Sequence, residues 1–94
     1  MTDTPDTPDT PLPEEREPPP GTVMTQWVIY DHPSDHPNGY VLRAAYIGQD
    51  NTITIDNAAW YSRNLETLRR IVPPGLVNLS RFADDDPAIL EVWL

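Results

Sequence analysis

The sequence predicts an α+β domain, in which one helix covers a small, mainly antiparallel sheet, preceded by a disordered acidic tail. The composition changes at residue 20: residues 1–20 hold seven prolines and no aromatic residue, whereas every Trp and Tyr lies further along the chain. Alternating and β-branched segments then predict strands, and one segment with a helical period predicts the helix. We therefore expect residues 1–21 to form the tail and residues 22–94 to form a single domain.

Three strands are expected in the first half of the domain, at residues 25–31, 40–47 and 52–55. Aromatic and β-branched side chains dominate the first two, TQWVIYD and YVLRAAYI, and such residues fit a pleated surface. In the third, TITI, the alternation predicts that Ile53 and Ile55 point inward and the threonines outward. The connections HPSDHPNG and GQDN are rich in turn residues, so the three strands should form an antiparallel meander.

One helix is expected at residues 63–72, because apolar side chains recur there at the helical period: Leu65, Leu68 and Ile71 or Val72. Its start has two candidate N-caps, Ser62 and Asn64. An acidic residue in the first turn and two arginines in the last suit the helix dipole, and Pro-Pro-Gly ends the helix. The preceding segment, residues 56–62, is expected to be coil or a first helical turn.

Two further strands are expected after the helix, at residues 76–82 and 88–94, with an ADDDP turn between them. The last strand, AILEVWL, is strongly apolar and would promote aggregation if it lay at an exposed sheet edge. We therefore expect it to be paired inside the sheet, which gives the element order βββ-α-ββ.

The charge and composition exclude several classes of protein. The chain has a formal net charge of −9, with six acidic residues in the tail, and phosphate backbones and anionic membranes repel such a chain. This disfavours direct nucleic-acid and membrane binding, and no apolar run approaches the ~20 residues of a membrane-spanning helix. Without cysteine, disulfides and thiolate zinc sites are excluded. We expect a cytoplasmic protein without a cofactor.

A loop that holds both histidines is the candidate metal site, because a repeated Asp-His-Pro motif supplies four ligand-type residues: Asp31, His32, Asp35 and His36. Imidazole nitrogen and carboxylate oxygen suit zinc, manganese or iron, so a metal-dependent hydrolase is an alternative function. Asp and Pro are also typical turn residues, and we favour a turn without metal. No serine has a nucleophile-elbow context and no glycine-rich phosphate loop occurs, which favours a non-catalytic protein.

The aromatic residues are the stronger functional indication. Three tryptophans, four tyrosines and one phenylalanine lie in the domain, more than so small a core is expected to bury. Exposed Trp and Tyr are typical of protein-binding surfaces, and we expect Trp27 and Trp93 in the core but Trp60 beside Tyr61 at the surface. The predicted interface candidates are Trp60, Tyr61, His32, Asp35, His36 and Asn38.

Three blocks of the sequence carry a resemblance to known proteins: WVIYDHPSDHPNGYVLR (27–43), IVPPGL (71–76) and DDPAILEVWL (85–94). They resemble short uncharacterised proteins of bacteria and their phages, with a YDHPxDxP-like start and a DDPxIxExW-like end. The resemblance spans residues 27–94 and omits the tail. It implies an accessory or mobile-element setting, and no activity, cofactor or residue roles.

Together these patterns predict a small protein that acts by binding another protein, as a regulatory or accessory factor. One alternative is an acidic inhibitor that mimics nucleic acid, which the net charge of −9 favours. The other is the metal-dependent hydrolase at the histidine loop. Homodimerisation stays open, because a unit this small has little core of its own.

Overall fold

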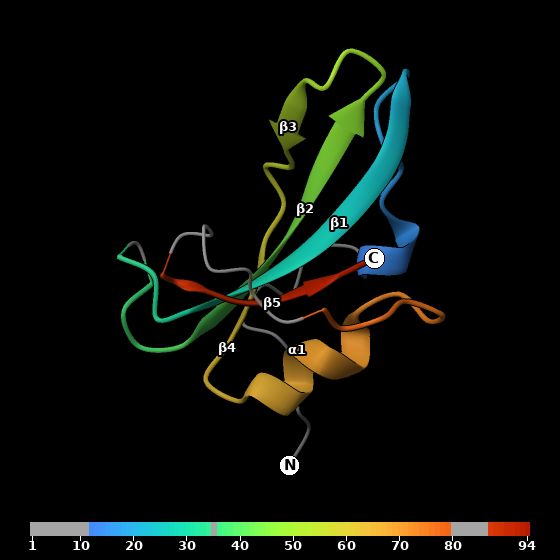
Figure 1. The fold of residues 1–94 in the computed structure, drawn as a ribbon. Coiled ribbons are helices and arrows are strands. Elements are labelled where there is room, and N and C mark those ends of the chain that lie inside the picture. Colours follow the sequence, from blue (N-terminus) through green and yellow to red (C-terminus); the bar gives the residue numbers. More distant parts are fainter. Residues whose placement is uncertain (1–11, 35, 80–86) are drawn as a thin grey trace.

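The computed structural model describes residues 12–34, 36–79 and 87–94. Within these residues, five strands form one antiparallel sheet, and one α-helix lies against one of its faces (Figure 1). The elements are β1 (Thr22–Asp31), β2 (Tyr40–Gly48), β3 (Ile53–Ile55), β4 (Trp60–Ser62), α1 (Leu65–Ile71) and β5 (Ile89–Trp93). The expected α+β class is confirmed.

The sheet has the strand order β3-β2-β1-β5, and β4 also pairs with β2, beyond the end of β3. The strands β1, β2 and β3 form the expected antiparallel meander, with Trp27 opposite Ala44 and Ile29 opposite Leu42. The C-terminal strand β5 pairs with the other side of β1, where Trp93 lies opposite Trp27. β5 is therefore the outermost strand in this order and not inside the sheet, contrary to the prediction. Backbone hydrogen bonds from residues 77–79 partly cover its outer side, which reduces the aggregation hazard of an open edge.

The core lies between the sheet and α1. Successive side chains of a strand point to opposite faces, so the core residues of β1 and β2 come from alternate positions. The buried cluster comprises Trp27, Ile29, Leu42, Ala44, Tyr46, Trp60, Leu68 and Val72. The last two come from the helix and its C-cap, which explains why the apolar stripe predicted for this segment faces the sheet.

The segment before the helix is a strand and not a helical turn. In β4, Trp60 pairs with Leu42 and Ser62 pairs with Tyr40, so this part of the chain is extended against β2. Of the two expected caps, Asn64 takes the N-cap position, where its side chain accepts a hydrogen bond from the Glu66 backbone N–H at 3.0 Å. The helix therefore begins two residues later than predicted.

The strand predicted at residues 76–82 is present only as a short paired segment. Val77 and Leu94 exchange two backbone hydrogen bonds of 3.0 and 3.1 Å, and Asn78 bridges to Trp93. Residues 80–82 lie outside the described residues. The contacts place residues 77–79 along the outer side of β5, which caps that edge of the sheet.

Ile53 and Ile55 do not point inward, and this prediction is wrong. Their exposed fractions are 65% and 45%. Ile55 lies opposite Ala45 and Ile53 lies opposite Ile47, whereas the core positions of β2 are Ala44 and its alternate neighbours. Both isoleucines are therefore on the face of the sheet that α1 leaves uncovered.

Residues 1–11 of the predicted tail lie outside the described residues, but residues 12–21 have defined contacts with the domain. A 3-10 helix, η1 (Pro13–Glu15), buries Pro13. The next residue, Arg16, donates from Nε and Nη2 to the two carboxylate oxygens of Asp56, at 3.0 and 2.7 Å. The sequence predicts a mobile segment here, whereas a buried carboxylate on the domain holds it in place.

Asp56 joins three parts of the chain. Besides Arg16, its carboxylate accepts hydrogen bonds from the Tyr46 hydroxyl at 2.6 Å and from the Ala58 backbone N–H at 3.0 Å. Burial opposes ionisation of this carboxylate, but the hydrogen bonds from Arg16, Tyr46 and Ala58 outweigh it and lower its pKa to about 2. Burial and the bond to Asp56 raise the pKa of Tyr46 to about 12. The ionised carboxylate is thus the stabilising form.

A second network joins α1 to β5. Glu91, only 4% exposed, accepts hydrogen bonds from Arg69 and from the Trp93 indole N–H, the latter at 3.0 Å. Arg69 also pairs with Glu66 on its own helix. Burial tends to raise the pKa of Glu91, but the bonds from Arg69 and Trp93 lower it overall. This network positions the helix over the last strand.

Replacement of Asp56 by Asn should lower the free energy of unfolding by roughly 2 kcal/mol at pH 7. This value follows from the difference between the pKa of Asp56 in the unfolded chain, 3.8, and in the folded chain, about 2. Because the folded pKa is the lower, this contribution is complete above about pH 4 and is lost as the pH falls through about 2. Urea titrations of both proteins from pH 7 to pH 2 measure it. Asp50→Asn, in an exposed turn, is the control, and an equal loss in both variants would contradict the role of Asp56.

Replacement of Glu91 by Gln should destabilise the protein by about 2 kcal/mol. A fully buried ion pair typically costs roughly 3–5 kcal/mol when one partner is removed, and the partly exposed Arg69 recovers some hydration. Glu66→Gln removes the exposed partner of the same arginine and should cost about 0.5 kcal/mol or less. Thermal and denaturant unfolding of the two variants compare these losses, and the reverse ranking would refute the assignment.

Candidate functional site

The face of the sheet opposite α1, named here the open face, carries an exposed apolar cluster. Met24 of β1 lies opposite Ile47 of β2, which in turn lies opposite Ile53 of β3. Ile55 follows two residues later on the same face. The exposed fractions of Met24, Ile53 and Ile55 are 39%, 65% and 45%. We call these four residues the isoleucine patch.

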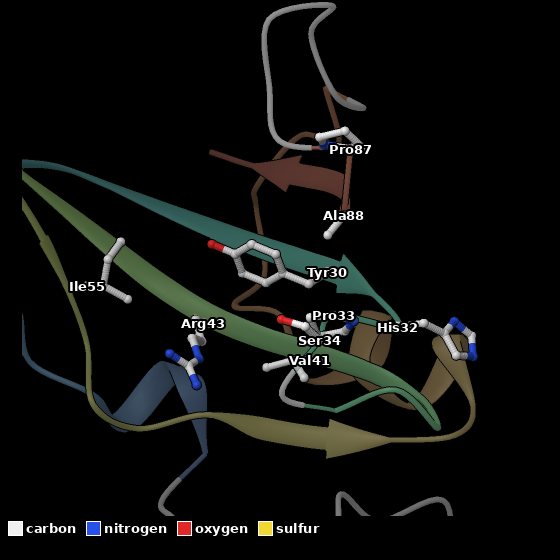
Figure 2. A pocket seen from close by; sticks show the side chains of 9 residues that line it. All are labelled: Tyr30, His32, Pro33, Ser34, Val41, Arg43, Ile55, Pro87 and Ala88. Atoms are coloured by element: carbon white, nitrogen blue, oxygen red, sulfur yellow. The ribbon is translucent and has the colours of Figure 1, made fainter.

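In the other half of the open face, the aliphatic side chains are buried. Val28, Val41, Ala45 and Val92 are 1–6% exposed. Tyr30 and Arg43 also project from this face of β1 and β2, and both are half-buried (Figure 2). In the strand register Arg43 lies opposite Val28, and Tyr30 lies opposite Val41, further from the isoleucine patch. The open face therefore has exposed isoleucines at one end, and buried aliphatic residues with an aromatic ring and a guanidinium along the rest.

A pocket of about 580 Å³ lies on this face (Figure 2). Its lining residues come from β1, β2, β3 and the two connections at the end of β1: Tyr30, His32, Pro33, Ser34, Val41, Arg43, Ile55, Pro87 and Ala88. The backbone N–H of Asp31 donates to the Ala88 carbonyl at 2.7 Å, which joins these connections. The lining is mostly apolar, with one permanent positive charge and a few hydroxyl groups, which is the usual composition of a binding pocket.

The two histidines of the predicted metal site lie against different faces of the sheet. The His32 ring contacts the Tyr40 ring edge-on at 5.2 Å and pairs through Nδ1 with Asp31. The His36 ring stacks on Tyr61 at 3.8 Å. Tyr40 packs against the core on the helix side, whereas Tyr61 lies opposite Val41 on the open face. The imidazoles therefore do not converge.

The described residues contain no group of three or more His, Asp or Glu side chains that could hold a metal ion. Asp35, the fourth residue of the predicted set, lies outside the described residues. In Figure 2 the His32 ring points away from the other labelled side chains, so it borders the pocket without turning into it. The geometry of Asp31, His32 and His36 is that of a turn, with His36 N–H bonded to the Pro33 carbonyl at 2.9 Å.

Three of the predicted interface residues are brought together. His36, Asn38 and Tyr61 line a smaller pocket of about 170 Å³ at the end of the open face. Gly39 also lines this pocket and lies so close to β4 that a Cβ atom there would be 2.7 Å from the Ser62 carbonyl oxygen. Only glycine allows the histidine loop to approach β4 this closely, and that approach places His36 on Tyr61.

Trp60 is not at the surface, contrary to the prediction. Its exposed fraction is 1%, and its ring centroid lies 5.7 Å from that of Trp27. Because side chains alternate along β4, burial of Trp60 places Tyr61 on the opposite face, where it is half-buried. Of the pair, only Tyr61 can belong to a contact surface.

Sequence patterns did not identify Tyr30, Arg43 or the isoleucine patch as functional candidates. One signal was present, because neither face of residues 40–47 is consistently polar. Apolar side chains on both faces of a strand indicate that each face either packs against other residues or carries exposed apolar groups. Arg43 is the single charged residue in that segment. The alternation could not say which of the two faces the helix covers.

Comparison with known proteins gave no match to a protein-family model, to a curated protein or to a solved structure. Among the helices of the described residues, none has the length and apolar character needed to cross a membrane.

Truncation of Trp60 to Ala should cost about 3–5 kcal/mol of stability, since it removes a buried aromatic side chain from the core. Tyr61→Ala, one residue further on the opposite face, should cost much less because its ring is partly exposed. Denaturant unfolding of the two variants gives both values. Similar small losses for both would mean that Trp60 is not in the core.

Proposed function

We propose that this chain is a small non-catalytic protein-binding domain, with a regulatory or accessory role, and that the open face is its contact surface. The observation that carries the proposal is the isoleucine patch, in which three large apolar side chains are 39–65% exposed beside one another. Contiguous exposed apolar residues on a small domain are typical of interaction sites, since their burial in water-free contact is favourable.

The charge distribution supports a contact on this face. The chain carries a formal net charge of −9. At the described strand positions of the open face there is no Asp or Glu, and Arg43 is the charged residue there. Depletion of carboxylates together with the presence of Tyr and Arg is the composition of interface hot spots. A partner can therefore approach this face without meeting the carboxylates found elsewhere on the chain.

The candidates from the histidine loop extend the same surface. Tyr61 and His36 stack at the end of the open face opposite to the isoleucine patch, with Asn38 beside them. Aromatic rings fixed by stacking lose little conformational entropy on binding, which favours them as contact residues. The resemblance to short bacterial and phage proteins supports an accessory setting for such a domain.

The two alternative functions have less support. A nucleic-acid mimic needs carboxylates displayed together on a binding surface, and the described strand positions of the open face have none. A metal-dependent hydrolase needs His32 and His36 to converge, and their rings contact tyrosines on opposite faces. Protein binding requires neither arrangement.

Replacement of Ile55 by Asp should abolish capture of the partner. The tagged chain is used as bait in extracts of its source organism, with chemical cross-linking and mass spectrometry. Ile55 is 45% exposed, so this change should leave the melting temperature nearly unaltered while it places a charge in the proposed contact.

Thr54→Asp is the matched control, because it introduces the same charge on the same strand with the side chain on the other face. We expect it to retain the partner. Equal capture by the wild type and both variants would place the contact elsewhere and refute the proposed surface.

A further inference from the structure

The pocket on the open face combines two features that a binding partner would have to match. Arg43 supplies a permanent positive charge, and Ile55 supplies an exposed apolar side chain. Ile55 lies opposite Ala45, and Arg43 is two residues before Ala45 on the same face. Such diagonal neighbours on an antiparallel pair have Cα atoms about 7–8 Å apart. The two features are therefore presented at a fixed spacing.

That spacing matches the repeat of an extended peptide. In a β-strand, side chains i and i+2 point to the same side and are about 6.6–6.8 Å apart. We propose, building on the protein-binding function above, that this pocket recognises an extended segment of the partner with an apolar residue and an acidic residue two positions apart. The apolar side chain packs on Ile55, and the carboxylate pairs with the Arg43 guanidinium.

The surroundings of Arg43 suit a carboxylate. Arg43 already has an interaction within the structure. A guanidinium carries five N–H donors, so it can bind a carboxylate in addition to another partner. The Tyr30 ring projects from the neighbouring strand β1 and lines the same pocket (Figure 2). Val41, Pro87 and Ala88 contribute apolar lining, beside the polar side chains of His32 and Ser34. An ion pair that is partly desolvated is stronger than an exposed one.

The net charge of −9 does not prevent this contact. No Asp or Glu is among the described residues that line the pocket. Asp31 is the last residue of β1, Asp50 lies in the turn between β2 and β3, and Asp56, which follows Ile55, is paired with Arg16. At physiological ionic strength the Debye length is about 8 Å, so exposed charges at the ends of the sheet are screened at its centre. Among the described residues that line the pocket, Arg43 is the one with a permanent charge.

A double-mutant cycle tests the inference. The probes are two synthetic peptides, acetyl-Thr-Leu-Thr-Glu-Thr-amide and the same peptide with Gln in place of Glu, titrated into the ¹⁵N-labelled full chain. We expect chemical-shift changes at Val41, Arg43 and Ile55, and at least five-fold tighter binding of the Glu peptide. In Arg43→Gln that preference should disappear while the Gln peptide binds as before. If Arg43→Gln fails to fold, Arg43→Lys takes its place in the experiment. This variant keeps the charge and should retain part of the preference for the Glu peptide.

Four results would overturn the inference. The first is equal affinity for the two peptides, the second is a preference for Glu that survives in Arg43→Gln, and the third is no binding of either peptide. A dimer in sedimentation velocity that Ile55→Asp dissociates would also overturn it, since a second copy would then occupy the face. The proposed function is tested separately by the capture experiment, which does not use these peptides. It is supported if the wild type and Thr54→Asp capture the partner and Ile55→Asp does not.

Discussion

The carboxylate of Asp56 is the interaction on which the arrangement of this domain depends. It lies between β3 and β4, and it binds the Arg16 guanidinium, the Tyr46 hydroxyl and the Ala58 backbone N–H. A buried charge left without partners would be strongly destabilising, so all three groups must be in place together. The chain N-terminal to β1, the core strand β2 and the connection to β4 are therefore fixed by one side chain.

The unequal faces of the sheet follow from having one short helix. A helix of seven residues covers the part of the sheet around Leu42, Ala44 and Trp60, and the Arg69–Glu91 pair holds it against β5. Among the described residues, no helix lies over the isoleucine patch. The described chain thus has one side stabilised by aromatic packing and two partly buried ion pairs, and another side with exposed apolar groups. The proposed binding surface is supported from behind by the core.

Local patterns predicted much of the fold, and the failures have physical reasons. The periodic leucines and Asn64 predicted the helix, and the aromatic and β-branched runs predicted β1, β2 and β5. The alternation of the TITI segment showed that Ile53 and Ile55 share a face. It did not show whether that face is covered, because this depends on where the helix packs. Trp60 lies in a segment too short for any period. The pair between Arg16 and Asp56, 40 residues apart, leaves no trace in local sequence.

The candidate site was predicted only in part. The predicted loop residues His36, Asn38 and Tyr61 do meet, whereas Arg43 and the isoleucine patch can be identified only once the strands are in register.

The close approach of Gly39 to the Ser62 carbonyl has a practical consequence for anyone who modifies this protein. Reporter groups and epitope tags cannot be inserted at the Gly39 end of the long hairpin loop without moving β4, and with it the first turn of the helix. The opposite hairpin, at Gln49–Asn51, is exposed and leads only into the short edge strand. Probes attached there would report on events at the sheet without disturbing the framework that forms it.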